Sequence, residues 1–177
     1  MTESLIPIAP GMDEPLEILS ACHSRFVSHL ETLDRLARWL PEHGADDDAQ
    51  QAAGNVMRYF DVAAHNHHRD EEEDLFPLLL ERCSPAARPR IRRLISWVKD
   101  DHRALEANWA ELKLQLTAIA EGRSGRLDTE LVANFSAQYH NHMDREDNEL
   151  LPFAANVLTA EDLRELGERM RERRTAR

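Results

Sequence analysis

Two stretches of this chain combine a histidine with a glutamate four residues later, and each then reaches two apolar residues and a proline. The first pair is His68 and Glu72, and the second is His142 and Glu146. Residues four apart lie on the same face of a helix, so each pair brings an imidazole and a carboxylate together. Each pair therefore offers two ligands to a metal ion, and the repetition predicts two metals or one shared cluster.

Histidines interrupt the apolar stripe of all four long helices that the sequence predicts. His23 lies in the stripe of the first helix and His102 in that of the third, while the second and fourth helices carry the two pairs. Two carboxylates and four imidazoles buried in one core are unstable without a cation, because uncompensated buried charge is costly. The candidate metal ligands are His23, His68, Glu72, His102, His142 and Glu146.

Capping residues, glycines and prolines divide the chain into helices that bring these side chains to a similar level. Helices are predicted from Asp13 to just before Pro41, from Asp46 to near Cys83, from Ser84-Pro85 to Gly122, from Asp128 or Leu127 to near Val157, and from Thr159 onward. Pro77 is expected to kink or weaken the second helix. Short connections favour antiparallel neighbours, so the predicted fold is all-α: an up-down-up-down four-helix bundle with an additional short C-terminal helix. The expected divisions are an irregular arm (1–12), the bundle (13–158) and the C-terminal helix (159–177).

Composition narrows the kinds of partner. The 177 residues carry a net charge of −11, which argues against nucleic acid. No apolar run reaches the length of a membrane span, and the first residues do not resemble a signal peptide. Cys22 and Cys83 lie far apart, which favours free thiols in a reducing compartment. We therefore expect a cytoplasmic protein that acts on neither nucleic acid nor membrane.

The order His…His-x-x-x-Glu…His…His-x-x-x-Glu resembles the hemerythrin-like family, whose domain is named the HHE cation-binding domain. The flanking segments HHRDEEEDLFPLL and HMDREDNELLPFA are also similar to that family. The resemblance spans roughly Pro15 to Leu158 and implies a four-helix bundle around two iron ions. It implies that Glu72 and Glu146 bridge the ions, together with an oxo or hydroxo group, and that the imidazoles cap them. Manganese and zinc also suit these donors.

The chain departs from the oxygen-carrying members of that family at several positions. The carriers have a second histidine on the third helix, where this chain has Val98, and they end the fourth-helix motif with an aspartate five residues after its histidine, whereas the motif of this chain has Glu146 at four. His65 is a candidate substitute for the absent ligand, and water or hydroxide is the alternative. His67 is expected to face solvent or to support the ligands from outside. His29 is a less favoured rival to the first-helix ligand, because it lies off the apolar stripe.

The resemblance implies a non-haem di-iron protein that binds or senses dioxygen, nitric oxide or redox state. The alternatives are an enzyme that decomposes peroxide or oxidises a small substrate, and a protein that stores iron or repairs iron centres. The expected partner is a small diatomic molecule or peroxide, and the sequence identifies no protein partner. No catalytic residue is predicted beyond the metal ligands. The buried acids argue against a helical interaction protein without metal.

Overall fold

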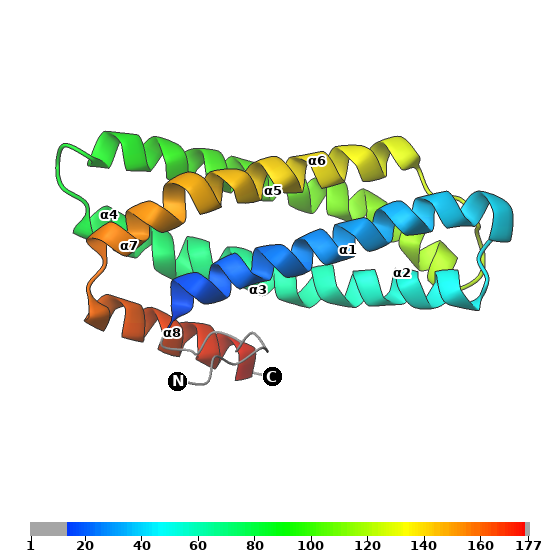
Figure 1. The fold of residues 1–177 in the computed structure, drawn as a ribbon, viewed down its shortest axis with the longest axis horizontal. Helices are drawn as coiled ribbons and strands as arrows, with labels where there is room; N and C mark the ends of the chain where they lie inside the picture. The colour runs from blue at the N-terminus through cyan, green and yellow to red at the C-terminus, as the bar shows by residue number, and fades with distance from the viewer. Residues whose placement is uncertain (1–13, 176–177) are drawn as a thin grey trace, which may run out of the picture.

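The structure, a computed structural model, describes residues 14–175, so the arm predicted for residues 1–12 lies outside the described part. The described chain is helical and has no strand, which confirms the all-α prediction. Four long helical stretches precede a shorter one (Figure 1). They are α1 (Pro15–His43); α2 (Asp47–Tyr59), η1 (Phe60–Ala64), α3 (His65–Arg69), η2 (Asp70–Leu75) and α4 (Phe76–Arg82) in continuous succession; α5 (Arg88–Ala120); α6 (Thr129–Arg145), η3 (Glu146–Leu150) and α7 (Leu151–Val157) in continuous succession; and α8 (Ala160–Thr175).

The long stretches form the predicted up-down-up-down bundle. Helix α1 packs against α2 and α6, and α5 packs against the same two helices, so each helix lies beside its neighbours in the chain (Figure 1). Helix α8 turns back beneath one end of the bundle and contacts α1 and η2. No helix in the described part of the chain is long and apolar enough to cross a membrane.

Side-chain caps fix several of the helix starts that the sequence predicted. The carboxylate of Asp46 accepts a hydrogen bond from the amide of Ala49, and Asp128 caps the start of α6 in the same way. Thr159 and Asp162 form a reciprocal capping box, in which each side chain accepts a hydrogen bond from the backbone amide of the other. The cap satisfies amides that the first turn of α8 leaves without helical partners.

Each repeated motif contains a π-helical segment directly before its proline. Segment η2 precedes Pro77, and η3 precedes Pro152, so both prolines lie in the first turn of the α-helix that follows. A proline inside an α-helix lacks an amide donor and clashes with the carbonyl four residues earlier, and a wider turn accommodates both problems. The chain therefore continues through Pro77 with a local change of helix type and a shift in which residues face inward.

The core consists of two apolar clusters with a polar layer between them. One cluster is built around Phe26, Leu112 and Phe135, and the other around Leu19 and Leu79. In α1 the second cluster ends at Leu19 and the first begins at Phe26, and in α5 the corresponding residues are Val98 and Leu105. The polar layer occupies the gap, and apolar packing on both sides shields it from water.

Candidate metal centre

Five histidines and two glutamates meet in the polar layer, and none is more than 5% exposed. They come from all four long stretches of the bundle, and they are His23, His67, His68, Glu71, His102, His142 and Glu146. Nothing apolar separates them, because their ligand atoms fall into overlapping groups in which all members lie within 4.8 Å of one another. The bundle thus holds a compact set of imidazoles and carboxylates in its interior.

The structure brings together five of the six predicted ligands and excludes Glu72. The Glu72 side chain is 32% exposed, and its carboxylate lies 2.7 Å from Nδ1 of His102 and 3.4 Å from Nζ of Lys99. Glu71 is fully buried and occupies the inner position instead. The sequence prediction extended one α-helical period from Phe60 onward, whereas η1 and η2 have wider turns that change which residues face the core.

The same change of helix phase buries both of the adjacent histidines, His67 and His68. His67 is 1% exposed, so the expectation that it faces solvent is wrong, and its ring lies in one group with His23 and Glu146. The candidate substitute His65 is exposed and lies outside the polar layer. His68 instead joins His102 and His142 in one group of three imidazoles. It is therefore a candidate for the imidazole that the third helix lacks at Val98.

The imidazoles divide into two half-sites. The first half-site contains His23 and His67, and the second contains His68, His102 and His142. This division gives the two half-sites unequal numbers of imidazoles.

The two buried carboxylates lie between the half-sites. Glu146 places Oε2 3.1 Å from Nε2 of His23 and Oε1 3.1 Å from Nε2 of His142. Glu71 places Oε1 3.7 Å from Nε2 of His67 and Oε2 3.3 Å from Nε2 of His102. Each carboxylate therefore directs one oxygen to each half-site, which is the arrangement of a bridging ligand.

Three imidazoles are oriented by a second carboxylate on their outer side. Nδ1 of His23 donates a hydrogen bond to Asp147 at 2.9 Å, and Nδ1 of His102 donates one to Glu72 at 2.7 Å. Nδ1 of His142 lies 3.2 Å from Asp101. A carboxylate on Nδ1 fixes the tautomer that leaves the Nε2 lone pair facing inward, as in many metal centres. Glu72 thus lies on the outer side of His102, where a supporting carboxylate would lie.

Without a cation, protons on the histidines balance the buried carboxylates. Burial alone would lower the pKa of His102, but the adjacent carboxylates of Glu146 and Glu71 raise it to about 10. Burial would raise the pKa of Glu146, yet the surrounding imidazoles, above all His142, hold it well below its usual range. Burial lowers the pKa of His68 well below its usual value, and the neighbouring imidazoles lower it further. The layer therefore already compensates its carboxylates with positive charge, which a metal ion would supply in place of protons.

The inward-facing atoms fit a metal centre because they lack hydrogen-bond partners. In the part of the chain that the structure describes, both oxygens of Glu71 and of Glu146 are buried without one. The same holds for Nε2 of His23, His67, His68, His102 and His142. Buried polar atoms are rarely left unpartnered, and so many in one place indicate a missing ligand. Imidazole and carboxylate donors without thiolate suit iron, manganese or zinc.

The sequence contained a signal for the two residues that the prediction missed. His67 and Glu71 are also four residues apart, so the motif can be read in two overlapping registers, one residue apart. The α-helical period of the apolar stripe favoured His68 with Glu72. Only the positions of the π-helical segments select Glu71, and those positions are not evident from the period alone.

Comparison with known proteins gives two matches. The model of the hemerythrin HHE cation binding domain matches residues 14–154, which include every residue of the polar layer. An uncharacterized protein of Haemophilus influenzae (strain ATCC 51907 / DSM 11121 / KW20 / Rd) is 31% identical over 162 residues. That alignment covers 92% of this chain and 91% of the relative, so the similarity extends beyond the matched domain into α8.

Proposed function

Because this chain belongs to the hemerythrin HHE cation-binding family, we propose that its metal is a pair of iron ions that bind dioxygen or nitric oxide. The observation that carries the proposal is the pair of buried carboxylates, Glu71 and Glu146, each of which faces both half-sites. A single ion requires no such arrangement, whereas two ions side by side are commonly held by shared carboxylates. When bound, iron supplies reversible redox chemistry and vacant positions for small ligands.

The residues of the chain would hold the two ions unequally. His68, His102 and His142 would hold one ion, and His23 and His67 would hold the other. The half-site with two imidazoles provides fewer protein donors, so it is the better candidate for binding an additional small ligand. Phe26 packs against both imidazoles of that half-site, with ring centroids 6.4 Å from His23 and 5.2 Å from His67. This apolar neighbour limits the access of water and favours a small uncharged molecule.

A second candidate is an enzyme that oxidises a small substrate at the same centre. The observation in its favour is a pocket of about 310 Å³ that reaches His68 from the surface. A diatomic ligand needs much less room, since one water molecule occupies roughly 30 Å³ in the liquid. The two candidates share the metal centre and differ in whether a larger molecule binds beside it.

The test is to load the full chain with ferrous iron without air, measure bound iron by elemental analysis, and record optical spectra before and after adding dioxygen, nitric oxide or peroxide. We expect about two irons per chain and a reversible spectral change with a diatomic ligand, because there are two half-sites. Rapid consumption of peroxide would favour the enzyme. His142→Ala should lower iron content, while His65→Ala, which alters an exposed histidine outside the layer, should not. Equal iron in both variants would overturn the site assignment.

A further inference from the structure

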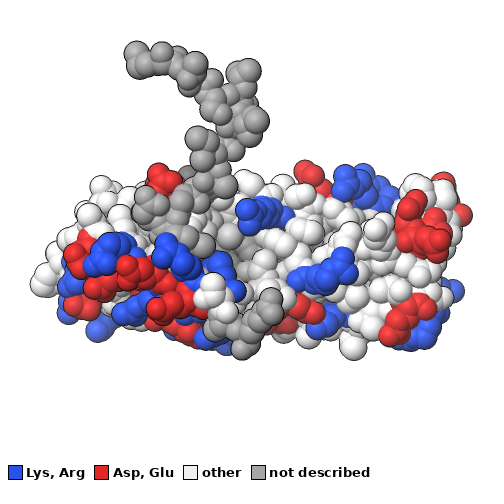
Figure 2. Space-filling view, turned by 90° about the horizontal axis from the view of Figure 1, so that it is seen from below, with Lys and Arg blue, Asp and Glu red and all other residues white. Residues whose placement is uncertain are grey.

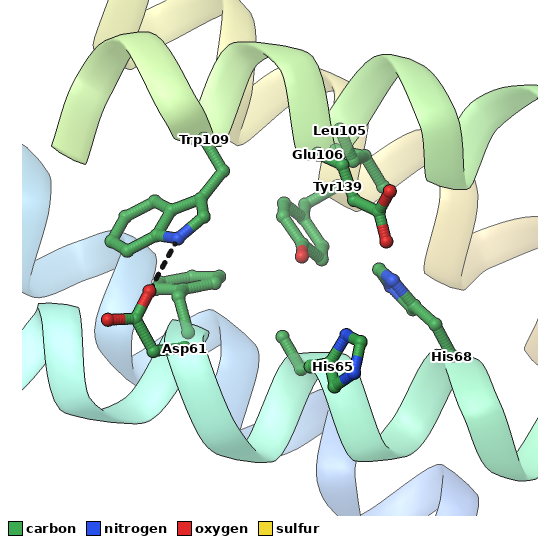
Figure 3. A pocket seen from close by; sticks show the side chains of 9 residues that line it. Asp61, His65, His68, Leu105, Glu106, Trp109 and Tyr139 are labelled. Atoms are coloured by element: carbon green, nitrogen blue, oxygen red, sulfur yellow. Dashed lines mark hydrogen bonds between the residues drawn. The ribbon is translucent and has the colours of Figure 1, made fainter.

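The pocket beside His68 has a buried polar group at its inner end. It opens between η1 and α5, and Tyr139 of α6 lies at its inner end with the hydroxyl pointing into the space (Figure 3). Tyr139 is only 2% exposed, and its hydroxyl makes no hydrogen bond to another residue of the described chain. A buried phenol aimed into a cavity without a partner indicates a ligand that can hydrogen-bond there.

The mouth of the pocket carries one uncompensated negative charge. The carboxylate of Asp61 is held by Nζ of Lys113 at 2.7 Å and by the indole N–H of Trp109 at 3.1 Å. Glu106 is exposed, makes no ion pair within the described part of the chain, and points toward the same space as Tyr139 (Figure 3). Asp61 therefore fixes the Trp109 ring, while Glu106 remains available for a cationic ligand.

Aromatic rings form the walls between the two polar ends. Trp109 and Phe60 lie with ring centroids 4.9 Å apart, and Leu105 completes an apolar side. A flat ring that carries a positive group fits such walls, because aromatic faces attract cations and stack with other rings. A cavity of roughly 150 Å³ is enough for benzene, so about 310 Å³ accommodates one ring with a short side chain.

We propose that this pocket binds a small aromatic amine, with its ammonium group at Glu106, its ring against Trp109 and a polar ring substituent at Tyr139. The site goes beyond the metal centre, from which the imidazole of His68 separates it. Only the side chain of His68 would separate a molecule bound there from the second half-site. The binding requires no change in the ligand's covalent structure.

Tyramine is a suitable probe, since it has an ammonium group at one end of the ring and a hydroxyl at the other. We would titrate it into the iron-loaded full chain by calorimetry, alongside 3-(4-hydroxyphenyl)propionate, which has the same ring and a negative charge. We expect saturable binding of tyramine and at least about fivefold weaker binding of the anion, which corresponds to about 1 kcal/mol of charge selectivity. No saturable heat with tyramine, or equal affinity for both probes, would overturn the proposal.

Variants separate the two ends of the pocket. Glu106→Gln removes the charge at nearly constant size and should weaken tyramine about fivefold while leaving the anion no weaker. Tyr139→Phe should weaken tyramine but not phenethylamine, which lacks the ring hydroxyl. Glu111→Gln, at an exposed position of the same helix outside the pocket, is the matched control and should change neither affinity. Unchanged tyramine affinity in both pocket variants would sink the proposal.

Iron content measured on the same samples keeps the two hypotheses apart. Two irons without tyramine binding would remove the amine site and leave the proposed function intact. Tyramine binding that depends on Glu106, in protein that takes up no iron, would support the pocket and remove the metal proposal.

Discussion

The two copies of the repeated motif contribute differently to the same centre. The first copy places two adjacent histidines, His67 and His68, in the polar layer, and they fall into different half-sites. The second copy contributes one histidine, His142, together with Glu146, which lies within 4 Å of an imidazole in both half-sites. One copy thus supplies more nitrogen donors, while the other supplies the carboxylate with the most contacts. The two copies share a histidine, a glutamate and a proline at matching positions, and the first copy adds one histidine to the layer.

The copies also differ in what supports them from outside. Asp70 and Asp74 flank Glu71 on η2, are 0% and 8% exposed, and both pair with Arg173 of α8. Arg174 adds a contact to Asp70 at 2.6 Å. The residue after Glu146 is Asp147, whose side chain is 40% exposed and contacts His23. Figure 2 shows the acidic and basic side chains closely interleaved at the end of the molecule where α8 lies. Within the described residues, the ion pairs that α8 makes with the motif copies therefore brace the first copy and not the second.

The largest expected effect comes from removing the carboxylate of the second copy. Glu146→Ala should lower iron affinity by more than about 100-fold, because it removes a carboxylate that both half-sites share. Losing a group that only supports a ligand has a smaller effect. Glu71→Ala should be nearly as severe, and Glu72→Ala should cost about 10-fold, since Glu72 only orients His102. Elemental analysis after dialysis against a graded chelator measures the order. A loss at Glu72 as large as that at Glu71 would restore Glu72 as a ligand.

The next prediction tests whether the two histidines of the first copy belong to different half-sites. His68→Ala should preferentially empty the second half-site, and His67→Ala the first, so each variant should retain about one iron. Each should also have a different spectrum, because the remaining ion keeps different imidazoles. His65→Ala is the control, since it changes a nearby exposed histidine. Identical spectra for the His67 and His68 variants would contradict the division into half-sites.

The overall fold was predictable because local signals and the apolar pattern agree. Asp46, Asp128 and Thr159 each lie within one residue of an observed helix start, and short connections dictate the antiparallel order. The candidate ligands His23, His102 and His142 were predicted correctly as members of the buried layer, because their helices are regular α-helix at those positions.

The errors in the site residues are confined to the one stretch where regularity fails. The predicted end of the first helix before Pro41 is also wrong, because α1 continues through Pro41 to His43. Two π-helical segments, η1 and η2, flank His67 and His68, and each alters the relation between residue number and helix face. Pro77 signals a disturbance at η2, but η1 contains no proline or glycine. The braces from α8 are long-range ion pairs, separated by about a hundred residues, and no local pattern specifies them.

Removing the ion pairs between Arg173 of α8 and the first motif copy should have a smaller effect, on the stability of the fold as well as on iron affinity. Arg173→Gln leaves Asp70 and Asp74 with fewer partners, and we expect it to cost about 2 kcal/mol, below the usual loss for a buried pair because Arg174 still contacts Asp70. That cost corresponds to a fall of roughly 4–8 °C in Tm. Arg164→Gln on the same helix breaks only exposed pairs and should cost less than about 0.5 kcal/mol.

The iron affinity of these two variants sharpens the comparison between the motif copies. If α8 positions Glu71 through its neighbours, Arg173→Gln should weaken iron binding, whereas Arg164→Gln should not. Arg173→Lys restores a positive charge but not the two-pronged contact, so it should recover stability better than affinity. A fall in Tm with unchanged iron affinity would show that the brace supports the fold and does not position the ligand.

The final prediction is a dependence of metal stabilisation on pH. In the metal-free chain the pKa of His102 is about 10 against an ordinary value of 6.5, and the pKa values of His23 and His67 are also raised. A raised pKa stabilises the fold fully below about pH 6.5, and that stability is lost as pH rises toward about 10. The lowered pKa of His68 has the opposite effect on the pH dependence of stability, but it is one histidine, whereas three histidines have a raised pKa.

Iron requires neutral imidazoles, so the iron-loaded chain does not lose this stability as pH rises. The difference in Tm between iron-loaded and metal-free protein should therefore widen from about pH 6.5 upward and narrow in acid, where protons compete for the same nitrogens. Thermal melts of both forms across this range measure the difference directly. In Glu146→Ala the imidazoles of His23 and His102 lose a carboxylate that raises their pKa, while Glu71 still faces His102 and His67, so the metal-free form should lose part of its own pH dependence. A gap in Tm that stays constant with pH in the unsubstituted protein would mean that protons do not substitute for the metal in this layer.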